Sequence, residues 1–246
     1  MRILALIILL SLTGCVTTGH KVDKSKMAEG YYTKGLSYLQ EKNYEMASVE
    51  FNRSLKFDNT YKLSYYGLGS ISNEQGKLED AEKYFLKAID QDPDYSDAYN
   101  ALGVIYEKQK KWKEAINAFN RALANKLYTT PHIPYLNLGD VYMEQKEYEK
   151  AVEAYRESKR FVNTEWTIIK LGTALFEAGK IKEAIAEFRE GIGLAPQNAN
   201  MRYSLAIAYL KAGNKKSALM EFRKAAELAP KSDLAQKANE YIMTLR

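Results

Sequence analysis

The stretch Ser96–Leu123, SDAYNALGVIYEKQKKWKEAINAFNRAL, contains two short apolar patterns separated by a polar turn. In its first half, the residues at the three- and four-residue spacing of one helix face are Tyr99, Leu102 and Tyr106. Gly103 and Ala115 are small, one on each predicted helix, where the two helices would approach closely. Phe119, one turn after Ala115, would fill the remaining space. This spacing predicts a helix pair, which can bury its apolar face only against neighbouring pairs.

The same pattern recurs along the chain at intervals near 34 residues. The small residue of the second helix is found at Ala47, Ala81, Ala115, Ala151, Ala184 and Ala218. The aromatic residue four positions later is found at Phe51, Phe85, Phe119, Tyr155, Phe188 and Phe222. The small residue of the first helix is found at Gly35, Gly69, Gly103, Gly139 and Gly172, with Ala206 in the last copy. Two extra residues enter the spacing across 129–132. Six copies in register indicate tandem repeats of one helix pair.

These residues resemble the W-x2-L-G-x2-Y…A-x3-F signature of the tetratricopeptide repeat (TPR), with Tyr99 in place of Trp. The resemblance implies an all-α TPR solenoid, wound as a right-handed superhelix. The predicted repeats are residues 28–61, 62–95, 96–129, 132–164, 165–198 and 199–232. Residues 233–246 are predicted to form a capping helix, with an apolar stripe of Leu234, Ala238, Tyr241 and Leu245. Terminal repeats need such a cap for solubility.

The composition of the 246-residue chain argues against several functions. The formal net charge is only +5, and Lys alternates with Glu along the predicted helices, so no basic stripe suited to nucleic acid is expected. The sequence contains no phosphate-binding loop, nucleophile elbow or H-E-x-x-H motif. The two histidines, His20 and His132, lie far apart in sequence, without the spacing of metal ligands. We therefore expect no enzyme, no cofactor and no small-molecule substrate.

The N-terminal stretch Met1–Gly14, MRILALIILLSLTG, has the short charged start and apolar run of a secretory signal. Leu12 to Cys15 resembles the lipobox of bacterial lipoproteins, which implies cleavage before Cys15 and acylation of it, including by palmitate. Cys15 is the only cysteine, so an internal disulfide is impossible. Val16 in place of Asp favours the outer membrane by the same resemblance. The alternative is an ordinary signal peptide with an incidental cysteine. Residues 15–27 are predicted to be the lipidated cysteine and a flexible tether.

The inner face of a TPR solenoid is lined by the second, fifth, ninth and twelfth residues of each repeat. In this chain many of these residues are large and apolar, which is typical of an interaction surface. The set nearest the tether is Tyr32, Leu36, Leu39, Leu63 and Tyr66, and the competing set in the fifth repeat is Trp166, Ile169 and Phe176. The alternative for each residue is packing against a neighbouring helix. The ninth residues, such as Val104 and Asp140, differ from the Asn of carboxylate-gripping TPR clamps, so an apolar or amphipathic partner is favoured.

A lipobox, a short tether and six TPRs resemble the type IV pilus pilotin lipoproteins of the PilF/PilW/Tgl group. The insertion Asn125–Tyr135, NKLYTTPHIPY, resembles the linker between the third and fourth repeats of that group. The resemblance implies a protein that faces the periplasm, binds the secretin subunit, carries it to the outer membrane and promotes assembly of the multimeric pore. The alternatives are an adaptor of peptidoglycan synthases or hydrolases and a component of an envelope export complex.

Overall fold

The structure, a computed structural model, describes residues 23–245, and in this range it is entirely helical with connecting turns. The thirteen helices are α1 (Lys24–Gln40), α2 (Tyr44–Phe57), α3 (Lys62–Glu74), α4 (Leu78–Gln91), α5 (Ser96–Lys108), α6 (Trp112–Ala124), α7 (His132–Glu144), α8 (Tyr148–Phe161), α9 (Glu165–Glu177), α10 (Ile181–Leu194), α11 (Ala199–Lys211), α12 (Lys215–Leu228) and α13 (Asp233–Thr244). The prediction of an all-α TPR solenoid is confirmed. The signal sequence and Cys15 lie outside the described residues.

Each repeat is an odd-numbered helix A followed by an even-numbered helix B, joined by a tight turn. One residue of each turn has a positive φ: Lys42, Gly76, Lys110, Lys146, Gly179 and Gly213, at φ between 57° and 78°. A left-handed residue at this place ends helix A and reverses the chain direction. Three of the six turns use lysine rather than glycine, so the packing of the helix pair holds these residues in a backbone region that non-glycine residues rarely adopt.

The core of every repeat is built from the small and aromatic residues whose spacing predicted it. The six alanines of the B helices are fully buried, and the six aromatic side chains that follow them are at most 2% exposed. A Cβ atom added to Gly103 would lie 2.5 Å from the Phe119 ring, so the ring lies directly against the backbone of helix A. The predicted role of glycine and alanine as places of close helix approach is therefore confirmed.

The outer face of the first repeat carries an ionic cluster. Repeats 2 to 6 bury an apolar residue seven positions into the repeat against the preceding B helix: Leu68, Leu102, Leu138, Leu171 and Leu205. In the first repeat this position is Lys34, whose ammonium lies 3.2 Å from the buried carboxylate of Glu50. Arg53 also pairs with Glu50, at 2.7 Å. An ionic cluster thus takes the place of a hydrophobic contact where no preceding repeat is present among the described residues.

The start of α1 corrects the predicted tether. The tether was expected to reach residue 27, but α1 begins at Lys24, so residues 24–27 are helical. Asp23 explains the earlier start, because its carboxylate accepts a hydrogen bond from the backbone N–H of Lys26 at 3.3 Å and caps the helix.

The last helix, α13, closes the opposite end of the solenoid. Its fully or nearly buried residues are Ala235, Ala238 and Ile242, whereas the predicted stripe contained Ala238 but neither of the others. Tyr241, which belonged to that stripe, stacks on Phe222 with the ring centroids 4.7 Å apart. The helix is therefore turned slightly from the predicted orientation, because it packs against both α11 and α12.

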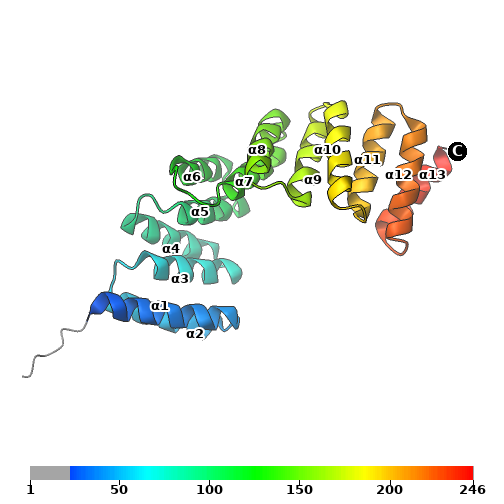
Figure 1. The fold of residues 1–246 in the computed structure, drawn as a ribbon. Helices are drawn as coiled ribbons and strands as arrows, with labels where there is room; N and C mark the ends of the chain where they lie inside the picture. The colour runs from blue at the N-terminus through cyan, green and yellow to red at the C-terminus, as the bar shows by residue number, and fades with distance from the viewer. Residues whose placement is uncertain (1–22, 246) are drawn as a thin grey trace, which may run out of the picture.

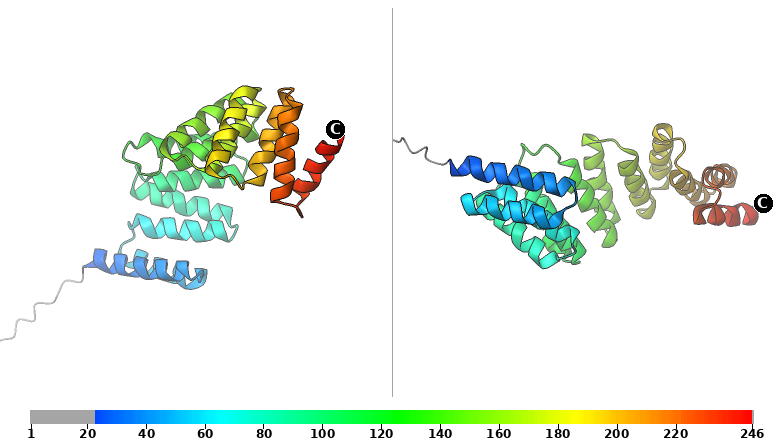
Figure 2. Two further views of the ribbon diagram at one scale, coloured as in Figure 1. Left: turned by 45° about the vertical axis from the view of Figure 1, so that its right-hand side comes forward. Right: turned by 90° about the horizontal axis from the view of Figure 1, so that it is seen from below.

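The repeats form one elongated, curved stack with the two ends of the described chain far apart (Figures 1 and 2). In Figure 1 the helices of the first three repeats run across the view, and those of the last repeats run up and down it. A helices of successive repeats pack on one another, α1 on α3 and α9 on α11 for example, whereas successive B helices make no comparable contact. The A helices therefore line the inner, concave side. Within residues 23–245, every helix is too short or too polar to span a bilayer.

Candidate protein-binding groove

The concave side carries a groove whose floor is formed by the A helices, and its N-terminal part is rich in tyrosine. Tyr32 of α1 packs on Tyr61 at the end of the first repeat, with the ring centroids 5.5 Å apart. Tyr66 of α3 repeats the arrangement with Tyr95, also at 5.5 Å. Burial raises the pKa of all four tyrosines above the ordinary value, so they stay neutral hydrogen-bonding groups over the physiological range.

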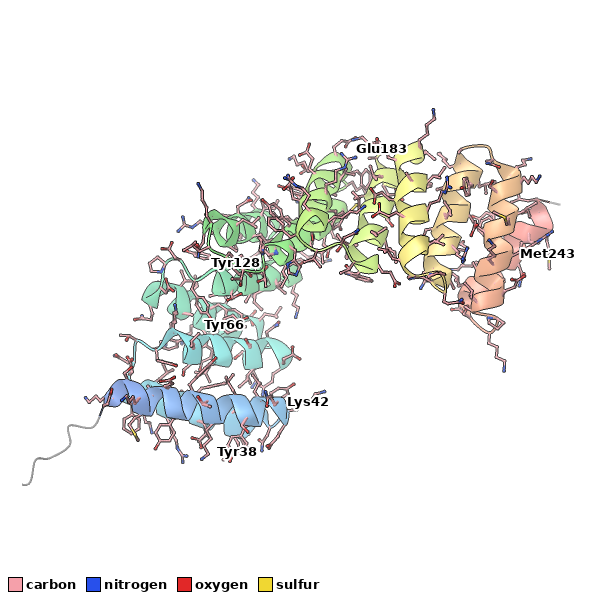
Figure 3. The ribbon with its side chains drawn as sticks, viewed as in Figure 1. Tyr38, Lys42, Tyr66, Tyr128, Glu183 and Met243 are labelled. Atoms are coloured by element: carbon pink, nitrogen blue, oxygen red, sulfur yellow. The ribbon has the colours of Figure 1, made fainter. Side chains whose placement is uncertain are left out.

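The long connection between α6 and α7 adds a further tyrosine to this part of the groove. The hydroxyl of Tyr128 donates to the carboxylate of Asp97, 3.1 Å away, and its burial raises the pKa of Tyr128 to about 12. Asn125 in the same connection donates a hydrogen bond to the backbone carbonyl of Asp94. These contacts anchor the inserted segment to the preceding repeat. Figure 3 shows Tyr66 and Tyr128 on successive layers of the stack.

Two of the predicted groove residues in the first repeats also belong to the core. The Tyr32 ring lies 5.7 Å from the ring of Phe51, and the Tyr66 ring lies 5.5 Å from that of Phe85. For these two tyrosines the alternative of packing against neighbouring helices also holds, because each ring bridges helix A, helix B and the next repeat. Their truncation would loosen the fold as well as the groove.

The leucines predicted beside these tyrosines differ in exposure. Leu36 is 36% exposed, whereas Leu63 is only partly accessible. Leu39 is half-buried against the core cluster that contains Phe51. Leu36 is therefore the member of the first predicted set that most freely presents an apolar side chain to a partner.

The second predicted set, in α9, lies farther along the same groove. Trp166 is 60% exposed, and the ammonium of Lys170 lies over its ring, 4.9 Å from the centroid. Ile169 and Phe176 are half-buried and pack against the core of repeats 4 to 6. Exposed tryptophan is frequent among residues that dominate binding energy at protein interfaces. The α9 set therefore combines one free aromatic side chain with two that shape the groove floor.

A charged cavity of about 400 Å³ opens in the groove between α7 and α9. Its lining residues are Glu107, Asp140, Met143, Glu144, Tyr155, Ile169, Lys170 and Thr173. The carboxylate of Asp140 accepts a hydrogen bond from the Tyr155 hydroxyl at 2.5 Å and pairs with the Lys170 ammonium at 2.6 Å. Burial and the negative charge of the neighbouring Asp140 raise the pKa of Tyr155 above its ordinary value, so the Tyr155 hydroxyl keeps its proton and donates the hydrogen bond.

Glu107 reaches the same cavity from α5. Burial raises the pKa of the Glu107 carboxyl, and the negative charge of Asp140 raises it further, although the charge of Lys170 acts in the opposite direction. A carboxylate held in such a position costs folding stability. Groups that carry this kind of cost are frequent at functional sites.

An apolar hollow of about 210 Å³ adjoins the charged cavity, between α9 and α11. It is lined by Thr173, Phe176, Glu177, Phe188, Tyr203, Ser204 and Ile207. Thr173 lines both hollows, so the two are contiguous along the groove floor. The central groove thus offers a charged part and an apolar part side by side.

The sequence-based assignment of the groove missed Lys170 and Tyr155. Lys170 occupies the sixth position of its repeat, which was not counted as a groove position, and Tyr155 was assigned to the core. One signal was present: Tyr155 is the only tyrosine among the six core aromatics, and only its hydroxyl can reach Asp140. A hydroxyl on an otherwise buried ring predicts a polar partner nearby.

A stack of paired helices whose A helices line one concave side is the architecture of a helical-repeat scaffold for protein interactions. Tetratricopeptide repeat models match residues 66–127 and 169–233, which is more than half of the chain, and further models match residues 28–61 and 134–160. The chain belongs to the tetratricopeptide repeat family. No curated protein matches its sequence.

Solved structures agree with the fold over most of the chain. PilF of Pseudomonas aeruginosa is 21% identical, with a TM-score of 0.75 over 88% of this chain and 98% of that one. PilW, a widely conserved type IV pilus biogenesis factor, is 20% identical, with a TM-score of 0.74 over 86% of this chain and 98% of PilW. YrrB, a TPR protein with an unusual peptide-binding site, is 22% identical, with a TM-score of 0.67 over 77% of this chain and 97% of YrrB. At these identities the likeness establishes the shared fold.

Proposed function

We propose that the chain is a non-enzymatic, lipid-anchored scaffold that binds the secretin subunit of a type IV pilus and promotes its outer-membrane localisation and multimer assembly. The observation that carries the proposal is the extent of the solenoid, which matches PilF and PilW over 98% of their length with no additional domain in the described residues. The groove supports it, because an exposed Trp166 and two adjoining hollows offer a site for a partner segment.

The anchor in this proposal is acylated Cys15, with the solenoid facing the periplasm. Only eight residues lie between Cys15 and Lys24, the first residue of α1, and eight residues span at most ~30 Å. The first repeat would therefore be held close to the membrane surface. A partner that must be delivered to the membrane would be presented near it.

The test compares the two groove sets in otherwise matched variants. Leu36→Ala with Leu63→Ala alters the first repeats without truncating Tyr32, and Trp166→Ala alters the fifth repeat. Secretin multimers in envelope membranes are measured by gel electrophoresis, and circular dichroism verifies folding. The proposal expects at least one of these variants to reduce multimers in a folded protein.

The outcome also separates the proposed function from its alternatives. Loss of multimers in the first variant alone assigns binding to the first repeats, and loss in Trp166→Ala alone assigns it to the fifth. If wild-type protein captures no secretin from envelope extracts and deletion of its gene leaves multimers intact, the secretin proposal is wrong. Capture of peptidoglycan synthases or hydrolases instead would favour the adaptor alternative.

A further inference from the structure

We infer that the central groove, from α7 to α11, takes a partner peptide carrying one cationic side chain next to a large apolar one. The cationic side chain would enter the cavity between α7 and α9, and the apolar side chain would enter the adjoining hollow between α9 and α11. This inference rests on the proposed role of the chain as a partner-binding scaffold, and it specifies the chemistry of the segment that is bound.

The floor of the groove is hollowed at the step from α7 to α9, the A helices of the fourth and fifth repeats. The cavity of about 400 Å³ lies at this step, where the helix direction changes in Figure 1. A cavity of this volume leaves room for an inserted side chain without displacement of any helix.

The lining of the cavity carries an excess of negative charge. Three carboxylates, those of Glu107, Asp140 and Glu144, face one ammonium, that of Lys170. Asp140 is already paired with Lys170, whereas neither Glu107 nor Glu144 forms an ion pair with any residue in the described part of the chain. Complementary charge favours a lysine or arginine of the partner over an acidic group. Arginine fits especially well, because its planar guanidinium can bridge two carboxylates.

The cavity disfavours the opposite ligand, a carboxylate. Lys170 is the only cationic residue lining the cavity, and its ammonium is held 2.6 Å from Asp140 and over the Trp166 ring. An incoming carboxylate would have to compete with Asp140 for this ammonium while facing Glu107 and Glu144. Like-charge repulsion in a partly buried site makes that arrangement unfavourable.

The charged cavity adjoins the hollow between α9 and α11. Thr173 lines both, while Phe176, Tyr203 and Ile207 make the apolar part of the hollow, which Glu177 also lines. Trp166 stands at the rim of the charged cavity, because Lys170 lies over its ring. A segment with a cation and a bulky apolar residue a few positions apart would occupy both hollows at once, and Trp166 would cover it from solvent.

The experiment uses purified full-length protein and a display library of random 12-residue peptides. The inference expects selected peptides to carry Lys or Arg within about four residues of Leu, Phe or Trp. Replacing that cation by Gln in a selected peptide should weaken binding about tenfold, since a charge-assisted hydrogen bond is worth roughly this factor. The affinity should also fall as salt rises.

Protein variants then locate the contact. Glu107→Gln with Glu144→Gln should lower the affinity about tenfold. Glu74→Gln, at the position of α3 that corresponds to Glu144 in α7, is the matched control and should leave binding unchanged. In a double-mutant cycle, the loss from the Gln peptide and the loss from the protein variant should not add, because both remove the same contact. Circular dichroism verifies that each variant is folded.

Three results would overturn the inference: selected peptides without an enriched cation, undiminished binding by the Glu107 and Glu144 double variant, or fully additive losses in the cycle. These results are independent of the secretin assay. Basic peptides that bind a protein unable to assemble secretin would refute the proposed function and leave the inference intact. If the protein assembles secretin but its selected peptides show no preference for a cation, the proposed function is supported and the inference is refuted.

Discussion

Replacing glycine by alanine should have opposite effects on stability at Gly103 and at Gly30, because a core aromatic ring lies against helix A at Gly103 but not at Gly30. Gly103→Ala places a Cβ atom 2.5 Å from Cε1 and 2.6 Å from Cδ1 of Phe119. Carbon atoms pack comfortably at about 3.5–4.0 Å, so the ring would have to move by about 1 Å. Phe119 is fully buried between the two helices, so such a movement would have to displace its packed neighbours. Gly30→Ala in the middle of α1 meets no atom within 4 Å.

The magnitudes follow from two opposing contributions. Alanine favours a helix over glycine by about 1 kcal/mol at both sites. Overpacking at Gly103 costs about 1–3 kcal/mol, toward the upper end because the ring is enclosed, which leaves a net loss of about 1–2 kcal/mol. Gly30→Ala should gain up to about 1 kcal/mol. For a chain of this length the expected shifts in Tm are roughly 2–8 °C downward for Gly103→Ala and roughly 2–4 °C upward for Gly30→Ala.

Urea and thermal unfolding followed by circular dichroism at 222 nm measure both variants against the wild type. A Gly103→Ala protein as stable as the wild type would refute the close packing of Phe119 on α5. A Gly30→Ala protein of reduced stability would contradict the exposed helical position assigned to residue 30. Because repeats unfold with their neighbours, hydrogen exchange in α1 and α5 shows whether each effect is centred on its own repeat.

The remaining predictions concern the core, the charged cavity and the anchor. Ala115→Leu should cost about 1–3 kcal/mol, because Ala115 is fully buried at a helix crossing, and an unchanged urea midpoint would contradict the assigned helix register. Glu107→Gln should make the protein more stable at pH 7, by less than about 1 kcal/mol after allowance for solvent screening. The raised pKa means that folded protein binds this proton more tightly than unfolded protein, so the advantage of Gln should shrink as the pH falls toward 4. A stability gain that does not depend on pH would argue against this origin. Cys15→Ser should abolish incorporation of labelled palmitate and leave the protein unanchored or unprocessed, and wild-type protein without label would refute the anchor.

Local sequence patterns were sufficient for the fold. The small residue of helix B and the aromatic residue one turn later, such as Ala115 and Phe119, recur in six copies, and their spacing alone specifies the contact they make. The first repeat departs from this pattern at Lys34, which stands where the other repeats carry leucine and pairs with Glu50. Such features depend on neighbours within one helix pair, and periodicity describes those neighbours well.

The choice between groove and core required tertiary structure for the tyrosines of the first repeats. Their position in the repeat correctly predicted that Tyr32 and Tyr66 lie on the inner side. It did not show that each ring also rests on a core phenylalanine and on a tyrosine of the following segment. A position in a helix specifies the direction of a side chain, but its burial depends on what the next repeat places above it.

The charged cavity was the feature that the sequence could least predict. Asp140, Tyr155 and Lys170 come from three different helices, α7, α8 and α9. Their meeting depends on the separation and relative rotation of the fourth and fifth repeats. Consensus residues such as Gly139 and Leu171 determine which helix faces pack, and they are nearly the same in every repeat. The volume of the cavity between α7 and α9 depends on how the side chains pack across that one interface, which only the packed structure decides.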